Sequence, residues 1–573
     1  MSNPITSASI DPVSGEERPW FEFYPPGVNR VIEPLQDQSL SDFARRKARE
    51  YGNNTAFSNL GGSLTFSDVD ALATKVASYL QNDLGLKRGD RIVLQMPNLM
   101  QYPVALYGAL RAGLVVVNAN PLYTASELSA VIADAEPRAI VVLANFAATL
   151  EKALKDVSVE HIIVTEAGDM LGQPKRSIVN FVAKNVKKMV PAFNLPGAVP
   201  FRALLEGKAS AWTDPDLTPD DTAFLQYTGG TTGGTKAAVL SHGNLLANQA
   251  QFIGQMRAVL DDGAVVIAAL PLYHVFALTV NCIGFFGFGG HNVLITNPRD
   301  IPAFVKTLDT TKPAALVLVS TLAGALMENE NFAKLDFSGL KISVAGGMAL
   351  RSSVAQKWHE LTDTDIIEGY GLTEASPVVS VNPTHLKPRV GTIGVPLPST
   401  DVKVIGEDGN PVANGEPGEL VVKGPQVMQG YWNKPEESAQ VLTDDGWLLT
   451  GDIASFEDDG YLRIVDRKKE IIVVSGFNVY PGDIEDAAML HPKVLEAGAI
   501  PLADEHAGEV PKLFVVRRDD SLTVDELKAF LKERLTGYKR PRQIEFLDEL
   551  PKTNVGKVLR RGLREMEESR TNS

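Results

Sequence analysis

Cysteine is almost absent from this chain of 573 residues, which contains only Cys282. A single cysteine cannot close an intrachain disulfide or build a thiolate metal cluster. Because disulfides are typical of oxidising compartments, a reduced cytoplasmic setting fits this composition best.

The sequence also lacks a long uninterrupted apolar run. Its most apolar stretch, about 263–295, is broken by Pro271, His274, Asn281 and His291. A membrane-spanning helix needs about 20 consecutive apolar residues. The N-terminus shows no charged-then-apolar signal pattern either. We therefore expect a soluble protein in which this stretch forms a buried strand, turn and helix.

Positive charge is in deficit, since 55 Lys and Arg face 70 Asp and Glu, a net charge of −15. Such a field argues against nucleic-acid binding and against a polybasic membrane anchor. It leaves room for a phosphate-bearing small ligand, which needs only a few local donors. Apolar residues make up 44% and charged residues 22%, so a disordered or coiled-coil chain is excluded.

The chain is too long for one compact core, so several lobes are expected. Over 35–214 and again over 222–382, short apolar runs alternate with helical patterns, which favours parallel sheets covered by helices. Strands with tight turns follow over 383–465, and a small α+β segment fills 466–573. The prediction is an α/β protein with a large N-terminal domain over 35–465, made of two parallel-sheet βα subdomains and a β-rich lobe. A Pro-rich, loosely held arm over 1–34 precedes it, and a small mobile α+β domain follows it.

The apolar patterns predict individual elements within the two α/β blocks. The predicted helices are Ser41–Tyr51 and Phe66–Leu80, and the predicted strands are Arg91–Met96, Leu114–Asn118, Ala139–Leu143, His161–Val164, Ala264–Leu270, Asn292–Ile295, Ala314–Val319 and Lys341–Ala345.

A loop rich in glycine and threonine, YTGGTTGGTK, occupies residues 227–236. Its backbone N–H groups, its hydroxyls and Lys236 could hold phosphate oxygens. The spacing differs from that of a Walker loop. Taken alone, the loop indicates phosphate binding no more strongly than a plain surface turn.

Two further segments could contribute to a nucleotide site. In EGYGLTE, residues 368–374, two glycines would let Tyr370 approach a flat ligand, and Glu374 offers a hard oxygen suited to Mg²⁺. Alone, a strand end with a solvated glutamate is the better interpretation. Asp452 lies in a Thr-Gly-Asp turn where its carboxylate could accept both hydroxyls of a ribose. Arg467 directly follows Asp466, and an ordinary charged turn is the alternative there.

Basic residues gather near the C-terminus. Residues 538–564 hold eight Lys and Arg against three Asp and Glu, a local net charge of +5. Within this segment Lys557 follows a glycine in the polar loop of PKTNVGKVLRR, residues 551–561. The local reversal of charge suggests a polyanionic ligand, although a solvated basic helix explains any single side chain better.

These segments, in this order and at these distances, resemble the adenylate-forming superfamily of acyl-CoA synthetases, luciferases and adenylation domains. The resemblance runs from about Ala56 to Arg564. Within that superfamily the chain is most similar to bacterial long-chain fatty acid–CoA ligases, through GWLLTGDIA, DRKKEIIVVSGFNVYP, PKTNVGK and PLYHVFALT at 271–279.

The resemblance implies a reaction in two steps. A fatty-acid carboxylate attacks the α-phosphorus of ATP and releases pyrophosphate, and CoA then displaces AMP to give the thioester. It implies ATP, Mg²⁺ and CoA as cofactor and cosubstrates. It also implies these positions: Thr228, Gly229, Gly230, Thr231, Thr232 and Lys236 for the β- and γ-phosphates, Tyr370, Gly371, Gly346 and Gly347 for adenine, Thr373 for the α-phosphate, Glu374 for Mg²⁺, and Asp452 and Arg467 for the ribose.

The resemblance further implies that Lys557 bridges the substrate carboxylate and the α-phosphate in the first step. It would arrive with the mobile last domain, whose rotation about Asp466 then brings Gly476 to the CoA channel. The acyl substrate would lie at His274, Val275 and Phe276, and an ordinary core histidine is an equally good interpretation of the first of these.

Three positions depart from the family pattern. Thr235 precedes Lys236 where relatives usually have Pro, Ser or Ala. Ala237 follows Lys236 where they usually have Gly, and Gly243 stands where they commonly have Arg. None of these changes removes a catalytic group, but loss of the second glycine would stiffen the loop exit.

Several alternatives stay open on the sequence. They are a CoA ligase for medium-chain or aryl acids, an acyl-AMP ligase that delivers to a carrier protein, and a non-catalytic acyl-adenylate or fatty-acid binder. No nucleic-acid partner is expected. Peripheral contact with the inner face of the membrane is predicted from the apolar substrate and the basic segment, and neither a monomer nor a homodimer is excluded.

Overall fold

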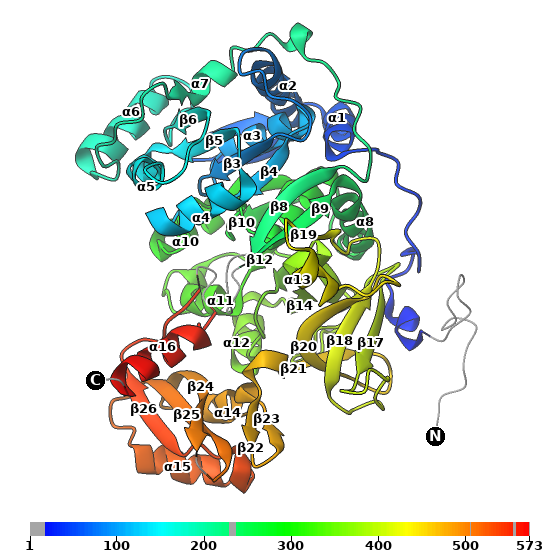
Figure 1. Ribbon diagram of the computed structural model, residues 1–573, viewed down its shortest axis with the longest axis vertical. Helices are drawn as coiled ribbons and strands as arrows, with labels where there is room; N and C mark the ends of the chain where they lie inside the picture. The colour runs from blue at the N-terminus through cyan, green and yellow to red at the C-terminus, as the bar shows by residue number, and fades with distance from the viewer. Residues whose placement is uncertain (1–17, 229–235, 505, 554–556, 572–573) are drawn as a thin grey trace. The chain divides into compact units, whose positions relative to one another are not determined.

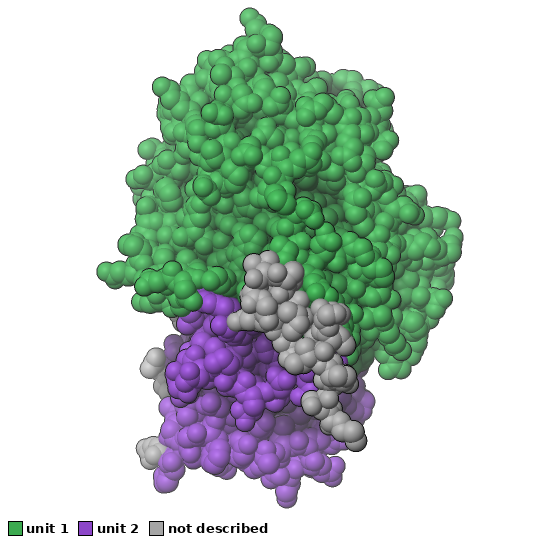
Figure 2. Space-filling view, turned by 90° about the vertical axis from the view of Figure 1, so that its right-hand side faces the viewer, with its two compact units in different colours: residues 1–401, 423–446 green, residues 402–422, 447–573 purple. Residues whose placement is uncertain are grey.

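The computed structural model describes residues 18–228, 236–504, 506–553 and 557–571. The chain divides into two compact units, coloured separately in Figure 2. Unit 1 contains Met1–Asp401 and Lys423–Gly446, and unit 2 contains Val402–Val422 and Trp447–Ser573. Among the described residues, no helix combines the length and the apolar character that a membrane crossing requires.

Unit 1 contains an eight-stranded sheet in the order β19-β9-β8-β4-β3-β5-β6-β7 (Figure 1). Its strands are β3 (Arg91–Gln95), β4 (Val115–Asn118), β5 (Ala139–Leu143), β6 (His161–Thr165), β7 (Val199–Pro200), β8 (Thr222–Thr228), β9 (Lys236–Ser241) and β19 (Gly430–Tyr431). Strands β3 to β8 run parallel, whereas β9 and β19 pair antiparallel. The four strands predicted in this region are confirmed as β3 to β6, within one residue at each end.

A nine-stranded sheet, also in unit 1, has the order β16-β15-β14-β13-β12-β10-β11-β1-β2. Its strands are β1 (Thr55–Asn59), β2 (Gly62–Thr65), β10 (Val265–Ala268), β11 (His291–Leu294), β12 (Ala315–Leu318), β13 (Ile342–Ala345), β14 (Ile366–Gly371), β15 (Val378–Val381) and β16 (Val395–Pro396). Each sheet takes strands from both predicted α/β blocks, because β1 and β2 join this sheet whereas β8 and β9 join the other.

Several helices of unit 1 begin at a side-chain cap. They are α1 (Leu40–Tyr51), α2 (Phe66–Asn82), α3 (Gln101–Arg111), α4 (Ala125–Ala135), α5 (Ala147–Ala153), α6 (Lys175–Phe181), α7 (Phe201–Leu204), α8 (His242–Arg257), α9 (Val275–Ala277), α10 (Ile301–Thr311), α11 (Ser320–Met327), α12 (Ser352–Thr362) and α13 (Pro435–Ala439). Capping boxes start α2, α4 and α8, where a Thr or Ser hydroxyl accepts the third backbone N–H. The two predicted helices are confirmed as α1 and α2.

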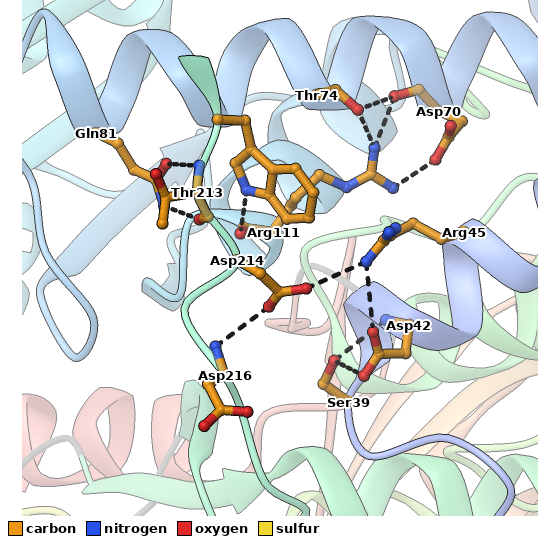
Figure 3. A network of polar contacts seen from close by, with 11 residues as sticks. Ser39, Asp42, Arg45, Asp70, Thr74, Gln81, Arg111, Thr213, Asp214 and Asp216 are labelled. Atoms are coloured by element: carbon orange, nitrogen blue, oxygen red, sulfur yellow. Dashed lines mark hydrogen bonds and ion pairs between the residues drawn. The ribbon is translucent and has the colours of Figure 1, made fainter. Parts of the chain in front are cut away.

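A buried arginine connects α2, α3 and the segment that leads into β8 (Figure 3). Arg111 is 2% exposed in its side chain and lies 2.6 Å from the Asp70 carboxylate. It also donates to Thr74, while the Trp212 indole donates to the Arg111 carbonyl at 3.1 Å. Asp214, further along the same segment, pairs with Arg45 of α1 at 3.3 Å. Charged hydrogen bonds therefore join three helices to one connection.

The arm over 1–34 is held more firmly in its described part than the sequence suggested. Trp20 and Tyr24 are buried at 5% and 8% exposure, and the Tyr24 hydroxyl donates to the Pro396 carbonyl at 2.7 Å. Arg18 pairs with Asp401 at 2.8 Å. The prediction of a loose arm is wrong for these residues, because aromatic burial and a long-range ion pair outweigh the polar composition.

Unit 2 contains two sheets. The first has the order β17-β18-β20-β21, with β17 (Asp401–Ile405), β18 (Gly418–Lys423), β20 (Leu448–Phe456) and β21 (Leu462–Arg467). The second contains β22 (Ile472–Val474), β23 (Phe477–Val479), β24 (Val494–Asp504), β25 (Gly508–Arg517) and β26 (Gln543–Leu547), with helices α14 (Pro481–Met489), α15 (Val524–Lys532) and α16 (Arg560–Thr571).

Strand β25 carries the core on both faces of this second sheet. Leu513 and Val515 pack into the cluster that contains Leu527 of α15, whereas Phe514 packs with Leu563 of α16. The alternation follows from the two-residue period of a strand. It fixes α16 on the face opposite α15, and the loop that carries Lys557 leads directly into α16.

Candidate active site

The Gly/Thr-rich segment connects two paired strands of unit 1. Thr228 ends β8 and Lys236 begins β9, and the two residues lie directly opposite each other in the antiparallel ladder. The Thr228 hydroxyl donates to the Lys236 carbonyl at 3.3 Å. The two ends of the segment are therefore fixed opposite each other in a hairpin of β8 and β9. The predicted phosphate contacts at Gly229, Gly230, Thr231 and Thr232 lie outside the described residues.

Tyr431, which the sequence alone did not indicate, connects Glu374 to the end of that hairpin. The Tyr431 hydroxyl donates to Glu374 Oε1 at 2.7 Å, and Lys236 Nζ lies 5.1 Å from the centre of the Tyr431 ring. Burial and the Glu374 charge raise the pKa of the Tyr431 hydroxyl, so it remains a donor at neutral pH. The structure thus brings together the Lys236 ammonium, the Tyr431 phenol and the Glu374 carboxylate.

The predicted adenine residues lie at the ends of two neighbouring parallel strands. Gly346 directly follows β13, and Tyr370 and Gly371 end β14, which pairs with β13. A Cβ atom at Gly346 would lie 3.2 Å from the Gly369 carbonyl and 3.2 Å from Phe276 Cζ. A Cβ atom at Gly371 would come within 2.2 Å of the Pro377 carbonyl oxygen, so only glycine fits.

The Phe276 contact links the predicted acyl segment to this strand end, since its ring borders Gly346. The neighbouring glycine, Gly347, has a φ of +79°. Thr373 begins the short turn η7 (Thr373–Ala375), which follows directly after β14 and contains Glu374. Adenine, α-phosphate and acyl candidates therefore share one end of the nine-stranded sheet.

His274 caps the short helix α9. Its Nδ1 accepts the Phe276 backbone N–H at 3.3 Å, and burial lowers the pKa of His274 to about 4. The imidazole is therefore neutral at physiological pH and acts as a polar cap instead of a cationic partner for a carboxylate. Val275 is buried, and the π-helical segment η5 (Leu278–Phe285) that follows is buried at every residue.

A buried chain of polar groups fixes the backbone next to His274. Gln226 of β8 donates to the Tyr273 carbonyl at 2.9 Å, and the Tyr102 hydroxyl donates to the Leu272 carbonyl at 2.8 Å. Asn118 connects these two side chains, accepting from Tyr102 at 2.7 Å and donating to Gln226 at 3.0 Å. Because Gln226 lies two residues before Thr228, this hydrogen-bond network supports both the β8–β9 hairpin and the predicted acyl segment.

Three predicted nucleotide residues come together within unit 2. Asp452 and Arg467 are register partners on β20 and β21, and Arg467 Nε lies 2.9 Å from Asp452 Oδ1. The Asp452 side chain is 5% exposed and that of Arg467 is 43% exposed. Lys557 is exposed when the whole residue is considered. Desolvation of its amino group and the charges of Arg467 and Arg560 lower the pKa of Lys557, and the Asp452 carboxylate opposes this shift. Its ammonium therefore lies within electrostatic range of the Asp452–Arg467 pair.

Asp466, the predicted hinge, is an anchored residue within this unit. Its Oδ2 accepts the Gly482 backbone N–H at 2.7 Å, and Arg560 Nη1 lies 2.9 Å from its Oδ1. Arg560 also forms two hydrogen bonds with Glu485, at 2.9 and 2.8 Å. The hinge role stays a prediction, while the structure ties this carboxylate to the helix that follows Lys557.

Gly476 has a conformational reason to be glycine. It lies with Ser475 in the two-residue turn between β22 and β23, and its φ is +84°. Ser475 also has a positive φ of 50°. This is the left-handed geometry that tight hairpin turns require. The predicted role at a CoA channel is a separate matter, because no neighbour lies within 4 Å of a Cβ atom placed there.

The model of the family described as AMP-binding enzyme matches residues 44–432, and that of the AMP-binding enzyme C-terminal domain matches residues 483–557. This chain belongs to the AMP-binding enzyme family. The adenylate-forming superfamily expected from the sequence motifs is thereby confirmed, as is the mixed α/β fold.

Relatives of this AMP-binding enzyme match it over nearly the full length. It is 52% identical to a long-chain-fatty-acid–CoA ligase of Haemophilus influenzae, covering 96% of this chain and 99% of the relative. It is 50% identical to the enzyme of that name from Escherichia coli, covering 95% and 98%. The crystal structure of the anthranilate CoA ligase AuaEII in complex with anthranoyl-AMP has a TM-score of 0.82 at 25% identity, covering 94% of this chain and 99% of the other.

The basic segment 538–564 of this family member carries less free charge than its composition suggests. Five of its eight Lys and Arg side chains pair with carboxylates: Lys539 with Asp483, Lys552 with Glu496, Arg560 with Asp466 and Glu485, Arg561 with Glu565, and Arg564 with Glu470. These pairs hold the segment to the rest of unit 2. The segment therefore gives weaker support to a polyanion-binding or membrane-binding surface than the count of +5 did.

Two of the departures from the family pattern can be located. Ala237 is buried on β9 opposite Tyr227. A Cβ atom at Gly243 would lie 3.0 Å from the Pro219 carbonyl oxygen, so the backbone leaves little room for a larger residue there. Thr235 lies outside the described residues.

Proposed function

We propose that this AMP-binding enzyme is an ATP-dependent long-chain fatty acid–CoA ligase. The observation that carries the proposal is the 52% identity to the Haemophilus influenzae ligase over 96% of this chain. The reaction consumes a fatty acid, ATP and CoA and forms acyl-CoA, AMP and pyrophosphate.

The first step makes the acyl group reactive. A carboxylate oxygen attacks the α-phosphorus of ATP, and the bond from that phosphorus to pyrophosphate breaks to give acyl-AMP. In the second step the CoA sulfur attacks the acyl carbonyl, the thiol proton passes to solvent, and AMP leaves with the oxygen that joined it to the acyl group. Splitting one difficult substitution into two easier ones is the advantage of such an intermediate.

Unit 2 supplies charge for the nucleotide. The Asp452 carboxylate accepts hydrogen bonds from the ribose hydroxyls, and Arg467 beside it is a second ribose contact. Lys557 stabilises the negative charge that builds on the α-phosphate as the carboxylate approaches. The proximity of these three groups supports these roles. Losing such a donor typically costs about 10²–10³ in rate.

Unit 1 supplies the phosphate and metal contacts. Thr228 and Lys236 hold the β- and γ-phosphates, Thr373 contacts the α-phosphate, and Glu374 is a ligand of Mg²⁺. Among the described residues no group of three His, Cys, Asp or Glu side chains could hold a metal alone. Mg²⁺ commonly binds one or two carboxylates together with substrate phosphates, so a single oriented Glu374 fits it. When bound, Mg²⁺ would neutralise charge on the phosphate oxygens.

Neutral apolar groups surround the acyl substrate. The Phe276 ring borders Gly346 of the proposed adenine site, and the neutral His274 places no positive charge beside the substrate carboxylate. The buried residues that follow Val275 line the chain, and each methylene buried there contributes about 0.8 kcal/mol. A long acid is therefore preferred to a short one. Rotation about Asp466, with Gly476 then at the CoA channel, stays a prediction.

A panel of acids tests the proposal. Straight-chain acids of two to twenty carbons and cinnamate are each mixed with the purified protein and ATP, and pyrophosphate is scored with and without CoA. We expect the highest kcat/KM for long chains, with a CoA-dependent thioester product. A maximum at cinnamate or octanoate would favour the aryl or medium-chain alternatives, and acyl-AMP that CoA cannot discharge would favour transfer to a carrier protein. Folded protein that releases no pyrophosphate with any acid would contradict ligase activity.

A further inference from the structure

One long stretch of unit 1 has a positive net charge, opposite in sign to that of the whole chain. Between Asp169 and Glu206 the sequence contains six Lys and Arg residues and no Asp or Glu, in a protein with a net charge of −15. The basic side chains are Lys175, Arg176, Lys184, Lys187, Lys188 and Arg202. An acid-free stretch of this length is unexpected in so acidic a chain.

The stretch forms a helix at the edge of the eight-stranded sheet. Helix α6 (Lys175–Phe181) continues without a break into the π-helical turn η3 (Val182–Val186). Together they lie in the connection from β6 to β7, and β7 is the last strand of that sheet. Figure 1 shows α6 at the periphery of unit 1.

Exposed apolar side chains gather along this helix and just beyond its end. Ile178, Phe181, Val186 and Met189 are 57%, 60%, 63% and 52% exposed, and Phe193 is 36% exposed. Ile178 and Phe181 lie one turn apart on α6, Val186 ends η3, and Met189 follows three residues later. Five of the thirteen large hydrophobic residues that are exposed in the described part of the chain therefore fall between 178 and 193. A local concentration of exposed apolar side chains of this kind marks an interaction site.

Polar contacts fix the opposite side of the helix to the protein. Asn180 accepts the Gly168 backbone N–H at 2.7 Å and donates to the Glu166 carboxylate at 2.8 Å. Lys175 donates to the Gly61 carbonyl at 2.9 Å. These contacts fix the orientation of α6, so its exposed apolar side chains cannot be buried by a simple roll of the helix.

Three lysines lie among these apolar residues along the chain. Lys184, Lys187 and Lys188 are all exposed, and none pairs with a carboxylate among the described residues. Protein–protein interfaces are depleted in lysine. In contrast, apolar residues flanked by lysines are the pattern of a helix that lies in the headgroup region of an anionic bilayer.

We propose that the α6–η3 surface, defined by Ile178, Phe181, Val186, Met189 and the lysines 184, 187 and 188, docks on an anionic lipid bilayer. The apolar side chains enter the headgroup boundary, and the lysines contact lipid phosphates. The charge complementarity selects a lipid surface over a second copy of this acidic chain. This binding does not depend on the proposed ligase activity, although it would bring such an enzyme to the membrane that holds its apolar substrate.

Vesicle sedimentation of the full chain tests the proposal without ATP, CoA or acid. Vesicles of phosphatidylcholine with and without phosphatidylglycerol are compared at low and high salt. We expect binding to the anionic vesicles that high salt weakens. The variant Lys184→Gln/Lys187→Gln/Lys188→Gln should bind about 100-fold more weakly, since each lysine near such a surface strengthens binding about fivefold. The variant Ile178→Ser/Phe181→Ser/Met189→Ser should lose about tenfold or more.

Matched controls separate this surface from general charge or stickiness. Lys306→Gln/Lys341→Gln/Lys357→Gln removes three exposed lysines elsewhere in unit 1, and Leu386→Ser/Leu490→Ser removes two exposed leucines. Both controls should bind as the wild type does, and unchanged urea unfolding shows that all variants fold. Equal binding by the wild type and both surface variants would overturn the proposal. So would a wild-type dimer that dissociates in the serine variant and ignores vesicles, because a second copy would then cover the surface.

Discussion

Replacing Arg560 by glutamine tests whether Arg560 positions Lys557. The substitution leaves the Lys557 amino group itself unchanged. Arg560 makes three charged hydrogen bonds: one to Asp466 at 2.9 Å and two to Glu485 at 2.9 and 2.8 Å. Its side chain is 16% exposed, while those of Asp466 and Glu485 are 4% and 18% exposed. Although burial opposes it, the neighbouring carboxylates raise the pKa of Arg560, so it is a permanent cation.

The magnitude follows from what remains after the substitution. Arg560→Gln leaves two largely buried carboxylates without their shared cation, and breaking a buried pair in this way costs about 3 kcal/mol. For a unit of about 150 residues that corresponds to a fall in Tm of about 6–12 °C. Arg561→Gln is the matched control. Arg561 pairs only with Glu565 one turn away, with 52% and 57% exposure, so we expect less than about 0.5 kcal/mol.

Calorimetry and the two half-reactions provide the assay. Lys557 precedes Arg560 by three residues, so loosening this anchor should slow pyrophosphate release about tenfold, as expected for a small loss of positioning. Conversion of presynthesised acyl-AMP with CoA should change less than about twofold. Arg560→Lys keeps the charge but loses the two-point contact with Glu485, and should give an intermediate result. If Arg560→Gln and Arg561→Gln gave the same Tm and the same rates, the reasoning would be refuted.

Three further predictions address other parts of the structure. Tyr431→Phe removes the hydrogen bond to Glu374, and should lower the rate of pyrophosphate release about tenfold and raise the Mg²⁺ concentration needed for half-maximal rate; an unchanged Mg²⁺ titration would count against this contact. Arg111→Leu removes the charged hydrogen bonds of a buried guanidinium to α2 and should destabilise unit 1 by about 1–2 kcal/mol in urea unfolding, because the Asp70 side chain is 38% exposed and stays partly hydrated; the activity of the folded enzyme should be retained. Burial lowers the pKa of His242 to about 4, whereas the unfolded imidazole binds a proton below about 6.5, so this residue alone should lower the stability by about 2 kcal/mol between pH 7 and pH 5, beside a similar effect of His274; His242→Asn should lack its own share of the loss.

The parallel strands were predictable because their signal is local. β5 matches its predicted range at both ends, and all five of its residues are buried, so the apolar run and the strand coincide. Pairing was not predictable. β1 lies beside β11, more than two hundred residues later, and no local pattern specifies that partner.

Helix α8 shows why a hydrophobic pattern can fail. Its buried face carries Asn244, Asn248 and Gln251, which a periodicity argument would place in solvent. Asn244 donates to the Pro425 and Val427 carbonyls, and Asn248 donates to that of Val378. Long-range backbone partners compensate the burial of these amides, and a sequence reading has no access to them.

The candidate site was predictable only where a motif carried it. Asp452, Arg467 and Lys557 were identified from family wording, and the structure brings all three together in unit 2. Tyr431 was missed because its partner, Glu374, lies 57 residues earlier and a lone tyrosine in a two-residue strand has no distinctive spacing. The same limit applies to Gln226, whose support of the acyl segment exists only in the fold.

Isotope tracing tests the central chemical claim most directly. Palmitate carrying ¹⁸O in both carboxylate positions is converted with ATP and CoA, and the AMP is examined by mass spectrometry. If the carboxylate attacks the α-phosphorus, AMP gains one ¹⁸O and the thioester carbonyl keeps the other. Label found in inorganic phosphate, or AMP without label, would mean that the acid does not attack that phosphorus.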